Sequence, residues 1–296
     1  MDLPSSLTPL EGGWSGETFL AEAGGERSVV RIFASPHHHP HAAEIQEALL
    51  HLVRGLVPVP QVKEVRRAHP EAGAPGLLVT EFVRGQRGDL LLPTLDDQRL
   101  AILGERLGRI AGTIAGMPFL ARGTFADAGL RIDPFPLGLE EWVAQHEEAL
   151  AWEDDDLAGL RQVAGDAQDR LDEIPRVSLV HSDLNPKNVL VDPGTLEVTA
   201  VLDWEFTHAG HPYTDLGNLL RFDRHRAYAD AVLRGWTDVR GGDPAGAHAD
   251  AVRDTARSAD LVALVELAAR KDANPVAARA HDRLLAVARA RDVNAT

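Results

Sequence analysis

The chain has 296 residues, a net charge of −15 at neutral pH and no cysteine, and 44% of its residues are hydrophobic. This length can bury one large core or two unequal ones, and the missing thiols exclude disulfides and thiolate zinc sites. The negative charge argues against a nucleic-acid partner, because phosphate recognition needs clustered Lys and Arg. No apolar run reaches membrane-spanning length and the first residues lack a signal-peptide pattern, so we expect a cytoplasmic protein with no membrane partner.

The first third of the chain is expected to be rich in β-strands. Residues 11–20 form a glycine-rich turn that runs into an alternating segment, 23–26 is a second turn, and 28–33 is a strand. The glycines would let backbone N–H groups approach phosphate oxygens, as in a hairpin that covers a nucleotide. A dinucleotide-binding fold would need a helix after the glycines. An ordinary hairpin is the alternative.

Arg31 lies on the strand 28–33, where its guanidinium could contact two phosphate oxygens. A surface arginine on an edge strand is the alternative. The histidine-rich tract 37–41 follows this strand. Adjacent histidines on a loop rarely converge on one ion, so we interpret the tract as a loop and keep a metal site as the alternative.

The next elements alternate between helix and strand. Residues 42–56 show an apolar stripe with helical spacing, and 57–60 must be extended around two prolines. Residues 76–85 read as a buried strand that opens into a glycine-containing connection. A helix capped by Asp97 is expected to run to about Ile114, and later helices are expected over 139–151, 154–171, 247–270 and 275–289.

Residues 132–160 carry nine acidic side chains and not one Lys or Arg. A dense negative patch of this kind would attract a polycation and exclude anions. The alternative is a solvated helix face in an acidic protein, with Asp154, Asp155 and Asp156 capping the helix that follows them.

The most informative motif is His181-Ser182-Asp183-Leu184-Asn185-Pro186-Lys187-Asn188, followed by Asp203-Trp204-Glu205. Phosphoryl transfer from ATP needs one carboxylate to hold the attacking hydroxyl, and an amide and a second carboxylate to hold Mg²⁺. Asp183, Asn188 and Asp203 supply these three groups. A turn at 192–195 between two apolar runs predicts a hairpin that brings Asn188 and Asp203 to the same end of neighbouring strands.

The segments HSDLNPKNVLVD, VLDWEF and HPYTDLGNLLR resemble the antibiotic phosphotransferases and choline kinases, which are relatives of the protein kinases. The resemblance implies an α+β, protein-kinase-like two-lobed fold. It places a small β-rich N-lobe at residues 1–85 and a larger, mainly helical C-lobe at 86–296, with ATP or GTP and Mg²⁺ bound between them.

The resemblance also implies roles for individual residues. Nucleotide contacts would come from Ser15 in the glycine loop, from Arg31 oriented by Glu44 (or by Glu47), and from backbone groups at Glu81 and Val83. His181 and the buried Asp215 would support the catalytic loop, and Asp183 would be the catalytic carboxylate. Candidate acceptor-binding residues are Asp154, Asp155, Asp156 and Glu205.

We therefore expect an ATP-dependent O-phosphotransferase with a small cationic hydroxylated substrate. The leading class is an aminoglycoside or a basic cyclic peptide of the capreomycin/viomycin type. The alternatives are a kinase for choline, an amino alcohol or a sugar, and a non-catalytic nucleotide-binding protein. The sequence does not discriminate ATP from GTP, or reveal the modified hydroxyl or the oligomeric state.

Overall fold

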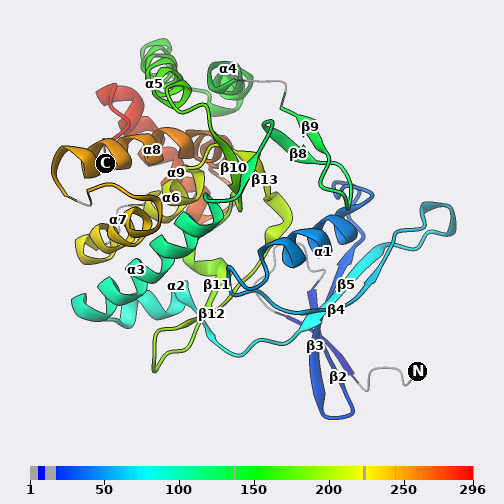
Figure 1. The fold of residues 1–296 in the computed structure, drawn as a ribbon. Coiled ribbons are helices and arrows are strands. Elements are labelled where there is room, and N and C mark those ends of the chain that lie inside the picture. The colour runs from blue at the N-terminus through cyan, green and yellow to red at the C-terminus, as the bar shows by residue number, and fades with distance from the viewer. Residues whose placement is uncertain (1–5, 11–17, 136–137, 223–224, 244, 296) are drawn as a thin grey trace. The chain divides into compact units, whose positions relative to one another are not determined.

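The computed structural model describes residues 6–10, 18–135, 138–222, 225–243 and 245–295 (Figure 1). These residues form an α+β fold that divides into two compact units. The first unit contains the described residues of Met1–Thr94, Gly123–Asp133 and Asn185–His208, and the second contains Leu95–Arg122, Pro134–Leu184 and Ala209–Thr296. The first unit is thus mostly N-terminal, but it also takes in the hairpin around Asn188 and Asp203. A single lobe boundary at residue 85 remains a prediction.

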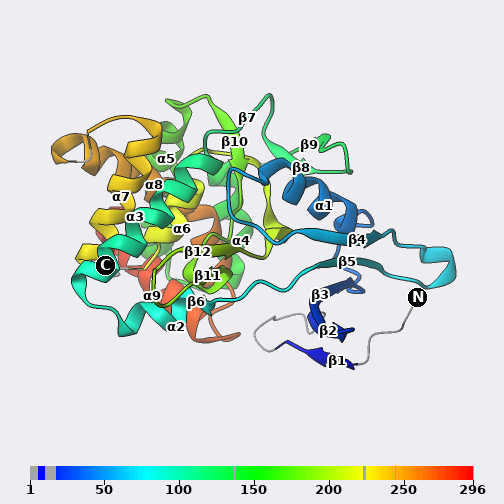
Figure 2. The same ribbon diagram turned by 60° about the horizontal axis from the view of Figure 1, so that its bottom comes forward.

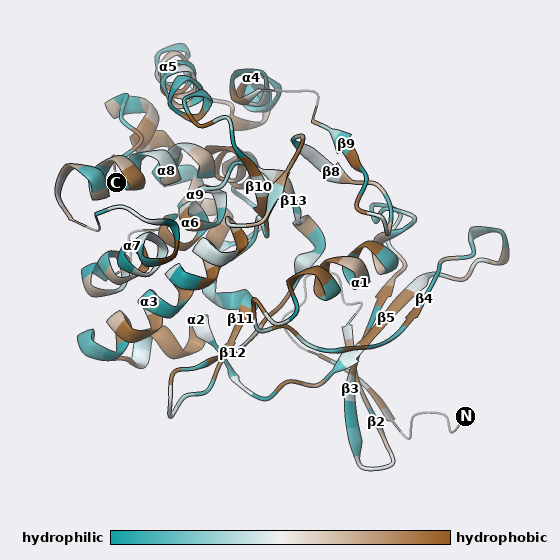
Figure 3. Cartoon of the chain, in the orientation of Figure 1, coloured by the Kyte–Doolittle hydropathy of each residue, from teal (hydrophilic) through white to brown (hydrophobic). Residues whose placement is uncertain are grey.

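A five-stranded antiparallel sheet forms the centre of the first unit, with strand order β1-β2-β3-β5-β4 (Figure 2). Gly24 and Gly25 connect β2 to β3 with φ angles of 58° and 83°, the conformation that tight hairpin turns require. In Figure 3, β5 is among the hydrophobic strands of this sheet, in agreement with its prediction as a buried strand. The strands are β1 (Ser6–Pro9), β2 (Thr18–Ala23), β3 (Glu26–Phe33), β4 (Val62–Arg66) and β5 (Gly76–Glu81).

Helix α1 (Ala42–Val53) packs against β4 and β5. It buries Ile45 and Leu49 of the predicted apolar stripe, and also Val53, which was not part of that stripe, whereas the predicted Leu52 is exposed. The helix ends three residues earlier than expected, because Arg54 already leaves the helical conformation with a ψ of 130° and Gly55 follows with a φ of 82°. Leu56, assigned to the stripe from the sequence, is exposed.

The hairpin predicted after the His181–Asn188 motif is present in the first unit. Strands β11 (Val189–Val191) and β12 (Val198–Val201) pair antiparallel, and β6 (Gln86–Arg87) adds to the free edge of β11. The Asp192 carboxylate holds the turn by accepting hydrogen bonds from the N–H groups of Gly194 and Thr195, at 2.9 and 2.8 Å. The short helices η1 (Pro70–Ala72), α2 (Gly88–Leu91), η2 (Leu92–Thr94), η3 (Pro186–Asn188) and η4 (Trp204–Phe206) and the strand β8 (Gly123–Phe125) also belong to this unit, and β9 spans Ile132–Pro134.

Helices dominate the second unit (Figure 1). They are α3 (Asp97–Ile114), α4 (Leu139–Leu150), α5 (Asp154–Asp172), α6 (Thr214–Leu220), α7 (Arg226–Arg240), α8 (Gly246–Ala268) and α9 (Pro275–Ala290). Strand β7 (Pro118–Phe119) pairs with β10 (Val177–Val180), and β13 spans His208–Gly210. A hydrophobic cluster joins α4, α5, α8 and α9, and includes Leu160, Val265 and Leu284.

Helices α3 and α7 pack closely because α3 carries glycines at the contact. A Cβ atom at Gly108 would lie 2.0 Å from the carbonyl oxygen of Val232, so no larger residue fits there. The cap of α3 differs from the prediction: Asp96, not Asp97, accepts a hydrogen bond from the N–H of Arg99. Among the described residues, none of the helices has both the length and the apolar character that crossing a bilayer requires.

Candidate functional site

The segment that contains Asp183 follows β10 in the second unit and is held by a carboxylate from α6. Asp215 accepts hydrogen bonds from the backbone N–H groups of His181 and Ser182, each at 2.9 Å. Asp215 is 2% exposed, and its burial raises the pKa of its carboxyl, although the two N–H donors act in the opposite direction. Asp215 therefore fixes the backbone directly before Asp183.

The backbone at Ser182 has a φ of 70°, a left-handed conformation that costs free energy for a residue with a Cβ. Next to it, the N–H of Asp183 donates to Nδ1 of the buried His181, at 3.3 Å. These constraints leave the Asp183 side chain partly exposed on a restrained backbone. Such an arrangement suits a group that must position a substrate hydroxyl.

A buried polar network supports this segment from behind, and the sequence reasoning missed it. The side-chain oxygen of Asn218 accepts from the N–H of Leu184 at 3.1 Å, and its amide nitrogen donates to Asp260 at 2.7 Å. Arg221 donates to both carboxylate oxygens of Asp260, at 2.8 and 2.7 Å. Asn218 and Arg221 belong to the motif HPYTDLGNLLR and lie about one and two helical turns after Asp215. This helical spacing is the sequence signal that could have identified them.

In the first unit, the hairpin brings the backbones of Asn188 and Leu202 together, next to Asp203. The N–H of Leu202 donates to the carbonyl oxygen of Asn188 at 2.8 Å, and Asn188 is buried. Asp203 follows with φ 64° and ψ 62°, again left-handed. Asn188 and Asp203 therefore lie at the same end of neighbouring strands, which is the arrangement that the hairpin prediction required.

Arg31 on β3 contacts the carboxylates that follow this hairpin. Its Nη1 lies 2.6 Å from Oδ1 of Asp203, and its Nη2 is hydrogen-bonded to the Glu205 carboxylate. His38, from the histidine tract, has its Nε2 4.0 Å from the same Glu205 carboxylate, and its ring packs edge-on against Phe33. The first unit thus gathers a candidate phosphate ligand and a candidate metal ligand in direct contact.

Comparisons with known proteins identify the family of the chain. Residues 6–249 match the model of the phosphotransferase enzyme family known as APH, which is most of the chain. The chain belongs to this family. It is accordingly a phosphotransferase, or kinase, with the mixed α+β fold of the APH family. The family membership that the sequence motifs indicated is confirmed.

Solved structures with a similar fold cover almost the whole chain. One is a thermostable mutant of the aminoglycoside phosphotransferase APH(4)-Ia in complex with ADP and hygromycin B, with a TM-score of 0.67, 18% identity, and coverage of 97% of this chain and 94% of that chain. Another is a microcompartment-associated aminopropanol kinase, with a TM-score of 0.68, 20% identity, and coverage of 96% and 91%. At these identities the likeness shows the fold alone.

A curated relative is acyl-CoA dehydrogenase family member 10 from Mus musculus, 27% identical over 241 residues. The match covers 79% of this chain but only 22% of that protein. The chain thus spans about a fifth of the length of this relative.

The candidate site of the first unit has oxygen donors of the type that Mg²⁺ prefers. Asp203 and Glu205 are carboxylates within reach of one cation, Arg31, and Asn188 directly precedes β11, the strand paired with β12. Three His, Asp or Glu side chains do not meet at a metal position anywhere in the described residues. A small donor set fits Mg²⁺ in a kinase, because Mg²⁺ is usually held by one or two carboxylates together with substrate phosphates and water.

One predicted ion pair does not form. Glu44 on α1 lies against His41 and Arg67, at 3.5 and 3.6 Å, and not against Arg31. Glu205 and Asp203 take the place expected for Glu44, because Arg31 points from β3 towards the end of the hairpin. The Arg31–Glu44 pair is therefore not made in this structure, and a role of Glu44 or Glu47 in nucleotide binding remains a proposal.

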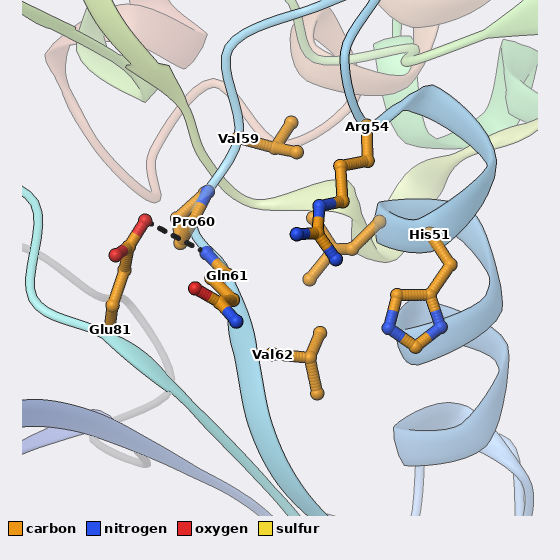
Figure 4. A pocket seen from close by; sticks show the side chains of 8 residues that line it. His51, Arg54, Val59, Pro60, Gln61, Val62 and Glu81 are labelled. Carbon is orange, nitrogen blue, oxygen red and sulfur yellow. Dashed lines mark hydrogen bonds between the residues drawn. The ribbon is translucent and has the colours of Figure 1, made fainter.

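At the end of β5, backbone groups that could meet a nucleotide are partly hydrogen-bonded within the protein. The N–H of Glu81 donates to the carbonyl of Gln61 at 2.9 Å, and the Glu81 side chain accepts from the N–H of Gln61 at 3.0 Å. Figure 4 shows this pair at the edge of a cavity of about 180 Å³ between the end of α1 and β4. This volume is below the roughly 300 Å³ of an ordinary ligand site, and Arg31 and Val83 do not line the cavity. Roles of Glu81 and Val83 in nucleotide binding remain proposals, and Ser15 lies outside the described residues.

The acidic segment 132–160 is partly neutralised by arginines from other elements of the second unit. Glu147 pairs with Arg161 on α5. Asp156 pairs with Arg289, and Asp155 with Arg291, near the end of α9. The hydrogen bonds from Arg161 and Arg289 lower the pKa of the Glu147 and Asp156 carboxyls. In the described residues, no ion pair involves the remaining acidic side chains, which are Asp133, Glu140, Glu141, Glu148, Glu153 and Asp154.

Proposed function

We propose that this chain transfers the terminal phosphoryl group of ATP to a hydroxyl group of a small molecule. The observation that carries the proposal is the contact of Arg31 with Asp203 and Glu205, next to the strand that begins after Asn188. A guanidinium for phosphate oxygens and carboxylates for a metal are the groups that phosphoryl transfer uses. GTP could serve as the donor in the same way.

In this proposal each residue has a separate task. Arg31 binds phosphate oxygens of the nucleotide, and Glu205 and Asp203 hold its guanidinium in place. Asn188 and Asp203 would hold Mg²⁺, which screens the charge of the phosphates when bound. Asp183 accepts a hydrogen bond from the acceptor hydroxyl and takes its proton as the hydroxyl oxygen bonds to phosphorus and the bond to the leaving ADP oxygen breaks.

We further propose a cationic hydroxylated acceptor, of the aminoglycoside or capreomycin/viomycin type, as the first substrate class to test. Support comes from the six carboxylates between residues 132 and 160 that form no ion pair with a described arginine. They would attract an acceptor with several positive charges.

A small amino alcohol or other metabolite is the second candidate, and a specific observation favours it. Arg161, Arg289 and Arg291 neutralise three of the acidic residues that were expected to attract a polycation, two of them in the Asp154–Asp156 run. The negative potential of the segment 132–160 is therefore weaker than its sequence suggests, which would suit an acceptor with one positive charge or none. The similar fold of an aminopropanol kinase is compatible with this alternative.

The test is ADP release from Mg·ATP by the wild type and by Asp183→Asn, with aminoglycosides, capreomycin-type peptides and amino alcohols as acceptors. We expect one acceptor to stimulate ADP release in the wild type and the substitution to lower the rate by about 10²-fold or more, as loss of a catalytic base does. Equal stimulation in both proteins would contradict the assignment of Asp183. Binding of Mg·ATP without turnover for any acceptor would favour a non-catalytic nucleotide-binding protein.

A further inference from the structure

Two arginines of the second unit meet at Gly116, directly after α3. Nη2 of Arg176 donates to the carbonyl oxygen of Gly116 at 3.1 Å. Nη1 of Arg240, the last residue of α7, would lie 3.2 Å from a Cβ atom at Gly116. Gly116 thus leaves the space in which the two guanidinium groups approach each other.

Neither arginine is paired with a carboxylate of the described residues. In the described part of the chain, no Asp or Glu oxygen lies within 4 Å of the Arg176 or Arg240 guanidinium, whereas neighbouring Arg109 contacts both Glu105 and Asp238. Burial and the charge of Arg176 lower the pKa of Arg240, although a guanidinium remains charged at neutral pH. Two adjacent cations without a counterion are unfavourable, and the protein as a whole has 15 more acidic than basic side chains available for pairing.

Arg176 donates to two neutral acceptors, which are the carbonyl oxygen of Gly116 and, through Nε at 3.4 Å, Oγ of Ser178. Two further polar groups of this part of the second unit, on Trp236 and Tyr213, carry donors. Trp236 lies four residues before Arg240, on the same face of α7, and its indole Nε1 is buried with no hydrogen-bond partner among the described residues. The ring of Tyr213 packs against Trp236 at 4.6 Å between centroids. Burial raises the pKa of the Tyr213 hydroxyl, so the group remains a proton donor at neutral pH.

We propose that Arg176, Arg240, Tyr213 and Trp236 form an anion-binding site on the second unit that takes a phosphate group. Two guanidinium groups balance the two negative charges of phosphate, and the indole and hydroxyl donors match its additional oxygens. The buried, unpartnered Trp236 donor indicates a bound ligand, because an unsatisfied buried N–H costs about 1–3 kcal/mol. This site is separate from Arg31, which belongs to the first unit.

Binding of inorganic phosphate, measured by thermal unfolding at constant ionic strength with chloride replaced by phosphate, tests the proposal. The wild type should be stabilised in a saturable manner. Arg176→Gln and Arg240→Gln should each weaken the apparent phosphate affinity by roughly tenfold or more, the loss expected for one charged hydrogen bond. Arg234→Gln is the matched control, because Arg234 lies on the same helix, is exposed, and has no ion pair in the described residues.

The nucleotide site also binds phosphate in the proposed function, so the assay is repeated in Arg31→Gln. Phosphate stabilisation that persists in Arg31→Gln and disappears in Arg240→Gln would support the second site. Stabilisation that disappears in Arg31→Gln, or that is unchanged in both Arg176→Gln and Arg240→Gln, would overturn it.

A second probe, glycerol 3-phosphate, distinguishes the source of the phosphate group. Tighter binding of glycerol 3-phosphate than of inorganic phosphate, with the same loss in Arg240→Gln, would identify the ligand as a phosphorylated small molecule. Tighter binding of inorganic phosphate would identify the free ion. Far-UV circular dichroism of each variant shows that a lost response does not come from unfolding.

Discussion

Arg31 contacts Asp203 at 2.6 Å, although the two residues are 172 positions apart in the chain. This ion pair ties the central strand β3 to the end of the β11–β12 hairpin within one compact unit. Its arginine would bind nucleotide phosphates and its carboxylate would bind the metal in the proposed function. Nucleotide binding would therefore replace contacts of Arg31 with Asp203 and Glu205 by contacts with phosphate oxygens.

Replacing Arg31 is expected to weaken nucleotide binding. Arg31→Gln removes the charge and both carboxylate contacts, and we expect the KM for ATP to rise on the order of 10- to 100-fold, since a charged hydrogen bond contributes about 1.5–3 kcal/mol. Arg31→Lys keeps the charge but contacts only one carboxylate at a time. Its KM for ATP should therefore lie between those of the wild type and Arg31→Gln. Steady-state kinetics with varied ATP measures the effect. An unchanged KM in Arg31→Gln would show that Arg31 is a structural residue.

The partner of Arg31 can be identified by comparing two glutamates. Glu205 is hydrogen-bonded to Arg31, whereas Glu44 lies 3.6 Å from Arg67 and 3.5 Å from His41. Glu205→Gln should lower kcat/KM for ATP by roughly tenfold or more, because it loosens the guanidinium. Glu44→Gln should change it by less than about threefold, and it serves as the matched control.

The reverse result, a large loss in Glu44→Gln and a small one in Glu205→Gln, would mean that the active conformation uses the pair predicted from the sequence. Thermal unfolding of both variants is the necessary check, because Glu44 is 6% exposed and its loss could also affect packing on α1.

Local sequence signals predicted much of the fold. The β11–β12 hairpin was identified because a turn with Asp192 and a glycine separates two apolar runs, and the helices α4, α5, α8 and α9 because apolar residues recur at helical spacing. Helices α6 and α7 were missed. The first is short and almost completely buried, so it has no polar face that would show a helical pattern. The second does bury one face, which includes Tyr228, Val232 and Trp236, but the prediction did not use this stripe.

The site could be predicted only as far as it is local in sequence. The spacing from Asp183 to Asn188 and Asp203 was visible, as was the later Asp215. The sequence does not reveal the partner of Arg31, because several acidic residues are possible partners. Only the three-dimensional path of β3 brings Arg31 to Glu205. Likewise, the counterions of Asp155 and Asp156 come from residues more than 130 positions away, so the acidic segment looked more negative than it is.

The buried pair of Arg221 and Asp260 is expected to be a main stabilising element of the second unit. Their side chains are 8% and 5% exposed, and Asp260 also accepts from Asn218, which holds Leu184. Arg221→Met leaves a buried carboxylate without its counterion, and we expect it to lower the free energy of unfolding by about 3–5 kcal/mol. Urea denaturation measures this loss.

The control is an exposed arginine that also pairs with an aspartate, in this case within one helix. Arg226 pairs with Asp230 on α7, with side chains that are 92% and 39% exposed, so Arg226→Met should cost no more than about 0.5 kcal/mol. If both substitutions had the same small effect, the Arg221–Asp260 pair would not be desolvated in solution.

The carboxylate of Asp215 is expected to be needed for the geometry of the catalytic loop. Asp215→Asn keeps one acceptor but turns an amide N–H₂ towards a backbone N–H of His181 or Ser182. We expect a loss of about 1–3 kcal/mol in unfolding free energy, the usual penalty for an unsatisfied buried group, and a lower kcat. A normal kcat in a destabilised Asp215→Asn protein would show that Asp215 contributes to stability but is not needed for the geometry of the loop that contains Asp183.

His211 is expected to make the stability of the protein depend on pH. Burial, with a smaller contribution from the positive charge of Arg122, lowers the pKa of His211 from 6.5 to about 4. Above pH 6.5 the side chain is neutral in both folded and unfolded chains and has no effect. Between pH 6.5 and about 4 only the unfolded chain takes up the proton, so acidification favours unfolding. From pH 7 to pH 5 this one group should lower the unfolding free energy by about 2 kcal/mol.

Urea denaturation at pH 7 and pH 5 checks this expectation in the wild type and in His211→Gln, which cannot titrate. The decrease in unfolding free energy between the two pH values should be about 2 kcal/mol smaller in His211→Gln than in the wild type. The exposed His248 provides the control, because His248→Gln should leave the decrease unchanged. Equal pH dependence in the wild type and His211→Gln would show that the His211 side chain reaches solvent and takes up its proton in the folded state.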